Sequence, residues 1–149
     1  MAGCDIMNCQ ANGFAVYIKQ GAILFMIKID IPNPDVVITK KKQVGEKVEA
    51  VISSVYGFTD YNKIPRDKGG IILFFNANDE LLFVGKARKL RPRVKRHFED
   101  TVSPIKAHRD EVYKIAVFAV EEPMEREIYE TYIINTLQAK YNIDKVFYK

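Results

Sequence analysis

The sequence predicts an α/β domain of the α+β kind, in which helices flank a small mixed or antiparallel central sheet. Three observations support this prediction. Residues 71–75 and 81–84 are short apolar runs joined by turn-forming residues, which is a hairpin pattern. Residues 112–120 alternate apolar and polar side chains and indicate a third strand. Residues 89–98 and 121–139 have helical character, and each follows one of these strands.

The chain before this region reads as an N-terminal extension over residues 1–65, with the main domain at 66–149. Residues 1–25 contain only two charged residues and no sustained periodicity. We therefore expect either that Met26 is the true start or that residues 1–25 are a loose extension. Residues 27–31 alternate like a strand that two following prolines end. Residues 44–56 fit a helix with Gly57 as its C-terminal cap, and a linker follows at 58–69.

Within the main domain, the two hairpin strands are apolar on both faces, so we expect them to be central in the sheet and covered on each side. Gly85 interrupts the second strand, and Pro92 is tolerated in the first turn of the helix that follows. Acidic residues and Pro123 favour the start of the last helix. Residues 143–148 are expected to add a final strand.

Composition excludes several classes of protein. The chain has 149 residues, 48% of them apolar and 28% charged, which is typical of a globular protein and not of a disordered one. The longest apolar run is far shorter than the roughly 20 residues that span a bilayer. Two cysteines, Cys4 and Cys9, cannot alone form a tetrahedral zinc site, and we expect reduced thiols in the cytoplasm.

Positive charge is concentrated in one segment. Residues 85–97 contain no acidic residue and seven basic ones: Lys86, Arg88, Lys89, Arg91, Arg93, Lys95 and Arg96. Such a patch is expected of a protein that binds a phosphate backbone, and also of an ordinary solvated basic helix. DNA is the expected partner, without a membrane or a small-molecule cofactor.

Three side chains are candidates for phosphate chemistry. Arg93 and His97 are four residues apart, so both project from one face of the predicted helix. Arginine offers a planar fork of donors to a phosphate, and histidine exchanges a proton near neutral pH. Glu130 aligns with Ile134 and Leu137 on the last helix, beside an apolar stripe where a carboxylate needs a pairing group or a cation. A Glu at the edge of the stripe that reaches solvent is the simpler alternative.

Together these residues resemble the motifs of the GIY-YIG endonuclease family, and most of all the N-terminal nuclease module of UvrC-type excision-repair endonucleases. The resemblance spans residues 70–142. Its motif positions are Gly70, Ile71, Ile72, Phe83, Val84, Gly85, Lys86, Ala87, Arg93, His97, Glu130 and Asn142.

The resemblance implies a role for each position. Glu130 would hold a single divalent metal, Mg²⁺ or Mn²⁺, and Arg93 would stabilise charge on the phosphoryl oxygens. His97 would assist proton transfer or hold the phosphate, and Lys86 would lie beside the nucleophile. Asn142 would fix local structure near the metal-binding helix. Separately, Gly85 would let its strand turn sharply into the basic helix.

The sequence departs from the family at both namesake tyrosines, which are replaced by Ile72 and Phe83. General acid–base assistance is worth about 10²–10⁴ in rate, so their loss matters. Lys86, His97 or another tyrosine could supply the function; the candidates are Tyr56, Tyr61 and Tyr113. Otherwise the domain binds DNA without cutting it.

Three functions follow. The first is metal-dependent endonuclease hydrolysis of a DNA phosphodiester, with nucleotide excision repair as the context that the resemblance suggests. The second is a catalytically degenerate DNA-binding module. The third is a protein-interaction domain whose basic helix meets an acidic partner. No sequence feature selects a DNA sequence or structure.

Overall fold

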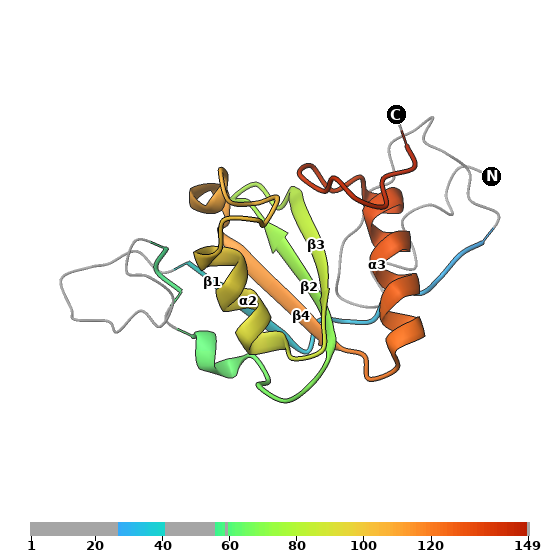
Figure 1. The fold of residues 1–149 in the computed structure, drawn as a ribbon, viewed down its shortest axis with the longest axis horizontal. Helices are drawn as coiled ribbons and strands as arrows, with labels where there is room; N and C mark the ends of the chain where they lie inside the picture. Colours follow the sequence, from blue (N-terminus) through green and yellow to red (C-terminus); the bar gives the residue numbers. More distant parts are fainter. Residues whose placement is uncertain (1–26, 41–55, 59, 149) are drawn as a thin grey trace.

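The computed structural model describes residues 27–40, 56–58 and 60–148 of the chain (Figure 1). Within these ranges, the elements outside the sheet are the helices α2 (Leu90–Glu99) and α3 (Pro123–Leu137) and two short 3₁₀ turns, η2 (Tyr61–Lys63) and η3 (Arg109–Glu111). The sheet contains β1 (Val36–Thr39), β2 (Gly70–Phe75), β3 (Leu81–Ala87) and β4 (Lys114–Ala119). Among the described residues, no helix has the length and apolar character needed to cross a membrane.

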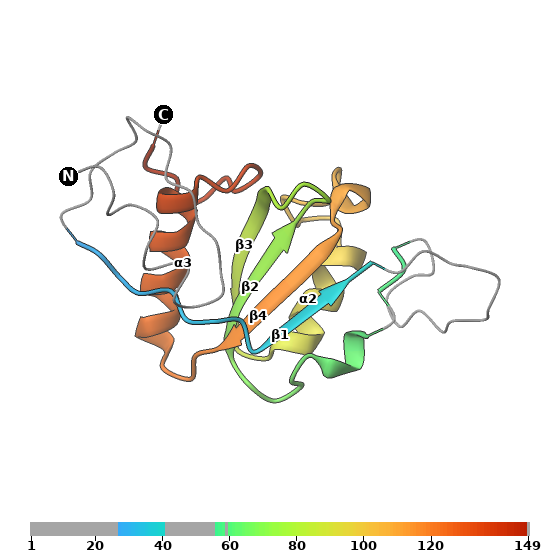
Figure 2. The ribbon, with the colours of Figure 1, turned by 180° about the vertical axis from the view of Figure 1, so that it is seen from behind.

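The four strands form one antiparallel sheet in the order β1-β4-β2-β3, so β4 and β2 are central (Figure 2). The hairpin between β2 and β3 has the predicted turn chemistry. The side chain of Asn76 accepts hydrogen bonds from the backbone N–H groups of Asn78 and Glu80, both at 2.9 Å. Asp79 takes the left-handed backbone conformation, with φ of 60°. The α+β class with an antiparallel sheet, predicted from the sequence, is confirmed.

The sheet lies between two apolar layers, one beneath each helix (Figure 1). Side chains of β2 alternate between the layers, with Ile72 and Phe74 on the α2 side and Ile71 and Leu73 on the α3 side. Every residue of β2 is buried for this reason. Burial of this kind contributes roughly 25 cal/mol per Å² of apolar surface, so β2 contributes strongly to the stability of the fold.

The N-terminal extension contributes to the same packed unit. β1 pairs with β4, with Ile38 opposite Ile115. Phe58, Tyr61 and Ile64 then join the apolar layer on the α2 side. The domain boundary expected at residue 65 therefore has core residues on both of its sides.

Both helices begin with the predicted proline-containing turn. Pro92 lies in the first turn of α2, where the missing N–H has no intrahelical partner to lose. Pro123 is the first residue of α3, which ends in a left-handed cap at Gln138 with φ of 53°.

Two predicted strands are wrong. Residues 27–31 alternate in polarity but form no strand, and the edge of β4 is paired by residues 36–39 instead. The tail over residues 143–148 forms turns and no strand. Alternation predicts a pleated face, but a strand also needs a partner edge, which sequence patterning does not supply. The expected central position holds for β2 and fails for β3, which is at the edge of the sheet.

The helix expected at 44–56 and the interpretation of residues 1–25 and Met26 fall outside the described residues, apart from Tyr56 at the helix end. Gly57 is described and has φ of 65°, the conformation in which a capping glycine is favoured.

Candidate active site

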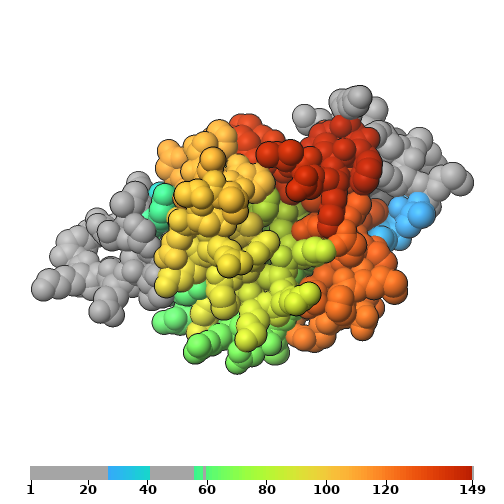
Figure 3. Space-filling view, in the orientation of Figure 1, coloured from blue at the N-terminus to red at the C-terminus, as the bar shows by residue number. Residues whose placement is uncertain are grey.

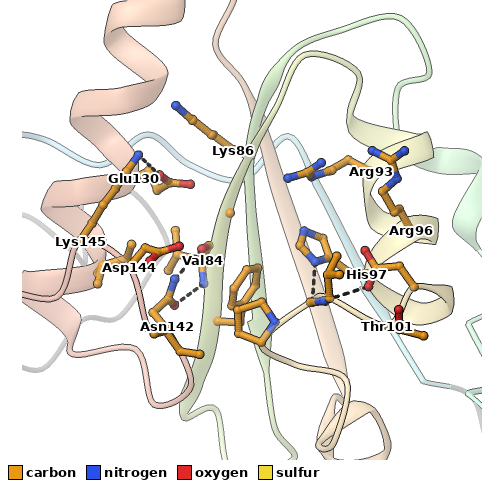
Figure 4. A pocket seen from close by; sticks show the side chains of 18 residues that line it. Val84, Lys86, Arg93, Arg96, His97, Thr101, Glu130, Asn142, Asp144 and Lys145 are labelled. Atoms are coloured by element: carbon orange, nitrogen blue, oxygen red, sulfur yellow. Dashed lines mark hydrogen bonds and ion pairs between the residues drawn. The ribbon is translucent and has the colours of Figure 1, made fainter.

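A pocket of about 580 Å³ opens beside the outer edge of β3 (Figure 3). One wall is formed by α2 and the loop that follows it, and the other by α3 and the C-terminal tail, with β3 between them (Figure 4). Its charged lining residues comprise four cations, Lys86, Arg93, Arg96 and Lys145, and three carboxylates, Asp100, Glu130 and Asp144. The excess of cations suits a phosphate-containing ligand.

The pocket exists because the tail covers only part of the β3 edge. The backbone N–H groups of Lys140 and Tyr141 donate to the carbonyl oxygens of Leu81 and Leu82 at 3.1 and 2.8 Å. The amide side chain of Asn142 then replaces a strand partner, because it accepts from the N–H of Val84 and donates to its carbonyl, both at 2.9 Å. Beyond Val84 the tail leaves the strand, and the next part of β3 forms the pocket floor.

Two motif glycines have steric roles in the sheet, and the role of Gly85 differs from the prediction. Gly85 does not turn the chain, because it lies inside β3 and pairs with Ile72. A Cβ there would lie 3.0 Å from the Phe83 ring, which is a tight contact, and 3.5 Å from Nε2 of His97, which is an ordinary one, so glycine leaves room chiefly for the Phe83 ring. At Gly70 a Cβ would lie 2.1 Å from the carbonyl oxygen of Phe118, so this glycine allows β2 and β4 to pair.

Arg93 and His97 both line the pocket from α2, as their four-residue spacing predicts (Figure 4). Arg93 is exposed, whereas His97 is only 6% exposed and packs on the Phe83 ring at 4.9 Å between centroids. Nδ1 of His97 is 2.8 Å from the hydroxyl oxygen of Ser103. Nε2 of His97 is buried and has no hydrogen-bond partner. A buried polar atom without a partner is costly, and here it belongs to a side chain that lines the pocket.

His97 is neutral at physiological pH. Burial, followed by the positive charge of Arg93, lowers the pKa of His97 to about 4, although Asp100 acts in the opposite direction. The hydroxyl of Ser103 also accepts from the backbone N–H of Ile105 at 3.3 Å, and this fixes its position. The Ser103 hydroxyl can either donate to Nδ1 or accept from it; Nε2 carries the proton in the first case and is a free acceptor in the second. The arrangement therefore holds one neutral, oriented imidazole at the pocket.

Glu130 lies on the opposite wall and is 8% exposed. Its Oε1 accepts a hydrogen bond from Nζ of Lys145 at 2.5 Å. Lys145 also pairs with Glu127, which in turn pairs with Lys86. Burial lowers the pKa of Lys145, but its hydrogen bonds to Glu127 and Glu130 outweigh this and raise the pKa above its ordinary value. Hydrogen bonds from Lys145 and Lys86 lower the pKa of Glu127.

The donor set fits a hard divalent cation with one protein carboxylate. Mg²⁺ is commonly held by one or two carboxylates together with water and substrate phosphate. Glu130 faces the pocket and would be that ligand. Within the part of the chain that the structure describes, no three His, Cys, Asp or Glu side chains converge into an all-protein metal cage. Water and phosphate would therefore complete the coordination.

The tyrosine positions of the family provide no hydroxyl group here. Ile72 and Phe83 are both buried in the apolar layer beneath α2. The alternative sources proposed from the sequence are also distant from the chemistry, because the pocket lining includes none of Tyr56, Tyr61 or Tyr113. The hydroxyl of Tyr61 donates instead to the backbone carbonyl of Arg91. Among the predicted substitutes, only Lys86 and His97 lie at the pocket.

The basic segment divides into two groups. Lys86, Arg93 and Arg96 line the pocket. The remaining basic residues of the segment lie outside the lining, and they are Arg88, Lys89, Arg91 and Lys95. Arg91 has a structural task, since its guanidinium donates to the carbonyl oxygens of Ile64 and Asn62 at 2.8 and 2.7 Å. Lys95 is 3.9 Å from Glu99 on the same helix.

Sequence reasoning missed two residues of this site. The sequence gives Ser103 no predicted role, because its contact with His97 depends on how the loop after α2 folds back. Lys145 was assigned to a strand, and the backbone turn that brings it to Glu130 has no signal in the periodicity of the chain. The sequence contains only one indication of Lys145, which is that a basic residue follows shortly after the Asn142 motif position.

The chain is similar in sequence to known proteins. The model of the UvrC-like GIY-YIG domain matches residues 68–143. The Uncharacterized protein YurQ of Bacillus subtilis is 68% identical over 124 residues, which is 83% of this chain and 100% of that protein. The UvrABC system protein C of Clostridium tetani is 34% identical over 92 residues, and the match covers 60% of this chain but only 15% of that relative.

Among solved structures, the GIY-YIG N-terminal endonuclease domain of UvrC from Thermotoga maritima, as a point mutant bound to its catalytic divalent cation, has a TM-score of 0.50. Its sequence identity is 20%, and the match covers 56% of this chain and 96% of that domain. The fold and motif order thus define a nuclease-type domain. The chain belongs to the UvrC-like GIY-YIG domain family, and the resemblance stated from the sequence is confirmed.

Proposed function

We propose that this chain is a divalent-metal-dependent endonuclease that hydrolyses a phosphodiester bond of DNA. One observation supports this most strongly: Glu130 of α3 and Arg93 of α2 line the same pocket, on either side of β3 (Figure 4). The carboxylate on one wall would hold a cation that bridges to the phosphate. The guanidinium on the other wall would donate hydrogen bonds to the same phosphate directly.

The bound cation, Mg²⁺ or Mn²⁺, would polarise the scissile phosphate and stabilise the leaving oxygen. Arg93 would bind the phosphoryl oxygens, where negative charge builds in the transition state. The unpartnered Nε2 of His97 would form a hydrogen bond to the phosphate or accept a proton from the attacking water. Lys86, whose side chain is 44% exposed, would supply a further positive charge near the water.

The biological context is part of this proposal. UvrC relatives support DNA repair as the process, and we propose the cytoplasm as the location. The exposed basic residues around the pocket, Arg88, Lys89 and Lys95, would bind phosphates flanking the scissile one.

The test is nicking of supercoiled plasmid in Mg²⁺ or Mn²⁺ by the full chain. Glu130→Gln removes the charge but retains the size, so we expect a loss of rate of about 10²-fold or more. Glu125→Gln is the matched control, since Glu125 is exposed on the same helix and lies outside the pocket lining. Equal nicking by wild type and Glu130→Gln would show that the proposed catalytic assignment is wrong.

A second function is favoured by one specific observation, the replacement of both namesake tyrosines by the buried apolar residues Ile72 and Phe83. It is a degenerate domain that binds DNA without cleaving it. It predicts binding that weakens steeply with salt, together with no metal-dependent nicking by the wild type. Metal-dependent nicking that Glu130→Gln abolishes would exclude this alternative.

A further inference from the structure

Lys145 already occupies the carboxylate that the proposed function assigns to the metal. Its Nζ is 2.5 Å from Oε1 of Glu130, and Figure 4 shows the two side chains joined inside the pocket. The Lys145 side chain is 29% exposed and that of Glu130 is 11% exposed. An ammonium group and a divalent cation cannot occupy the same position on one carboxylate oxygen.

The backbone around Lys145 is held in place on both sides. Asn135 of α3, which is 6% exposed, donates through Nδ2 to the carbonyl oxygen of Lys145 at 2.8 Å. Its Oδ1 accepts from the backbone N–H of Phe147 at 2.6 Å. Lys145 itself has φ of 62°, a left-handed conformation that is unfavourable for a residue with a side chain. The lysine is therefore placed by the fold and is not a loose surface side chain.

A second carboxylate lets Lys145 leave Glu130 without losing a partner. Nζ of Lys145 also pairs with Glu127, whose side chain is 44% exposed and which pairs with Lys86 as well. Moving wholly onto Glu127 would break only one of two charge-assisted hydrogen bonds. The free energy of such a bond is large enough to weaken the binding of a competing cation to Glu130 by roughly ten- to a hundredfold.

We propose that Lys145 is an internal counter-cation of Glu130, which keeps the metal position closed until a divalent cation displaces it toward Glu127. This inference rests on the proposed function, in which Glu130 is the metal ligand. In the resting protein the ammonium neutralises the buried carboxylate. In the loaded protein the cation neutralises Glu130, and the released ammonium of Lys145 is available to a phosphate oxygen in the same pocket.

The experiment measures the dissociation constant for Mn²⁺ alone, by calorimetry and by the electron paramagnetic resonance signal of free Mn²⁺. The full chain is compared with Lys145→Gln and with Lys140→Gln, which makes the same charge change in the same tail. Lys140 is exposed and lies outside the pocket lining. We expect Lys145→Gln to bind Mn²⁺ about tenfold or more tightly than Lys140→Gln, and expect the gain to vanish in Lys145→Gln/Glu130→Gln.

Equal Mn²⁺ affinity in Lys145→Gln and Lys140→Gln, or no binding by any variant, would overturn the proposal. Circular dichroism establishes that each variant is folded, and Lys145→Met, which keeps the apolar stem, replaces Lys145→Gln if the latter is not. The plasmid assay separates this proposal from the proposed function. Nicking that requires metal and Glu130, combined with unchanged Mn²⁺ affinity in Lys145→Gln, refutes the counter-cation alone. Tighter binding without nicking refutes the nuclease alone.

Discussion

The buried histidine makes the stability of this protein depend on pH in a calculable way. Folding lowers the pKa of His97 from its ordinary value of 6.5 to about 4, chiefly through burial and then through Arg93. The unfolded chain therefore binds one more proton than the folded chain between these two values. Stability rises with pH wherever the unfolded state binds more protons, so His97 causes stability to fall as the pH drops below about 6.5.

The size of the effect follows from the two pKa values. At pH 7.5 the histidine is neutral in both states and contributes almost nothing. At pH 5 it is almost fully protonated when unfolded and mostly neutral when folded, which lowers the free energy of unfolding by about 2 kcal/mol. Below pH 4 the loss levels off at about 3 kcal/mol, because each pKa unit corresponds to about 1.4 kcal/mol.

Urea unfolding at pH 7.5 and pH 5 tests this for the wild type and for His97→Gln. All other ionisable groups are common to both proteins, so their contributions cancel in the comparison. We expect the wild type to lose about 2 kcal/mol more than the variant over this interval. If both proteins lose the same amount of stability, folding does not lower the pKa of His97, and the linkage argument is wrong.

Three further predictions concern how the site is built. Gly70→Ala places a Cβ 2.1 Å from a carbonyl oxygen of β4, so thermal unfolding should show a destabilisation of about 1–3 kcal/mol, and an unchanged Tm would contradict the steric argument. Asn142→Ala leaves the N–H and carbonyl of Val84 without their side-chain partners and should lower the free energy of unfolding in urea by about 2 kcal/mol, whereas unchanged stability would exclude this edge-capping role. Arg88→Gln should reduce the salt slope of DNA binding by about one without affecting stability, because Arg88 would bind a phosphate. Arg91→Gln should lower the free energy of unfolding by about 1–2 kcal/mol, because its guanidinium holds two backbone carbonyl groups. The reverse pattern would show that the two roles are misassigned.

The elements that the sequence predicted well are those with strong local signals. The β2–β3 hairpin has two apolar runs and a turn in which Asn76 binds its own backbone. Helix α2 has a proline where only a first turn tolerates it, and α3 has a proline and an acidic residue at its start. Each of these signals acts within a few residues, so the chain determines them before any tertiary contact forms.

The strand errors arise where a partner decides the outcome. Residues 27–31 and 36–39 both have β-compatible side chains, and only the latter reach the free edge of β4. At the other edge, the side chain of Asn142 takes the place of a strand and the tail turns away after it. Gly85 reads as a strand breaker by itself, but next to the Phe83 ring it is the residue that fits.

The sequence alone determined the family, the order of its motifs and the helical spacing that places Arg93 and His97 on one face. It did so because motif spacing and helical period are properties of the chain itself. Only the tertiary structure decided that Glu130 shares a pocket with Arg93, that Ser103 orients His97, and that Lys145 neutralises Glu130. These contacts join separate elements, and their geometry depends on how helices, loop and tail pack around the free edge of β3.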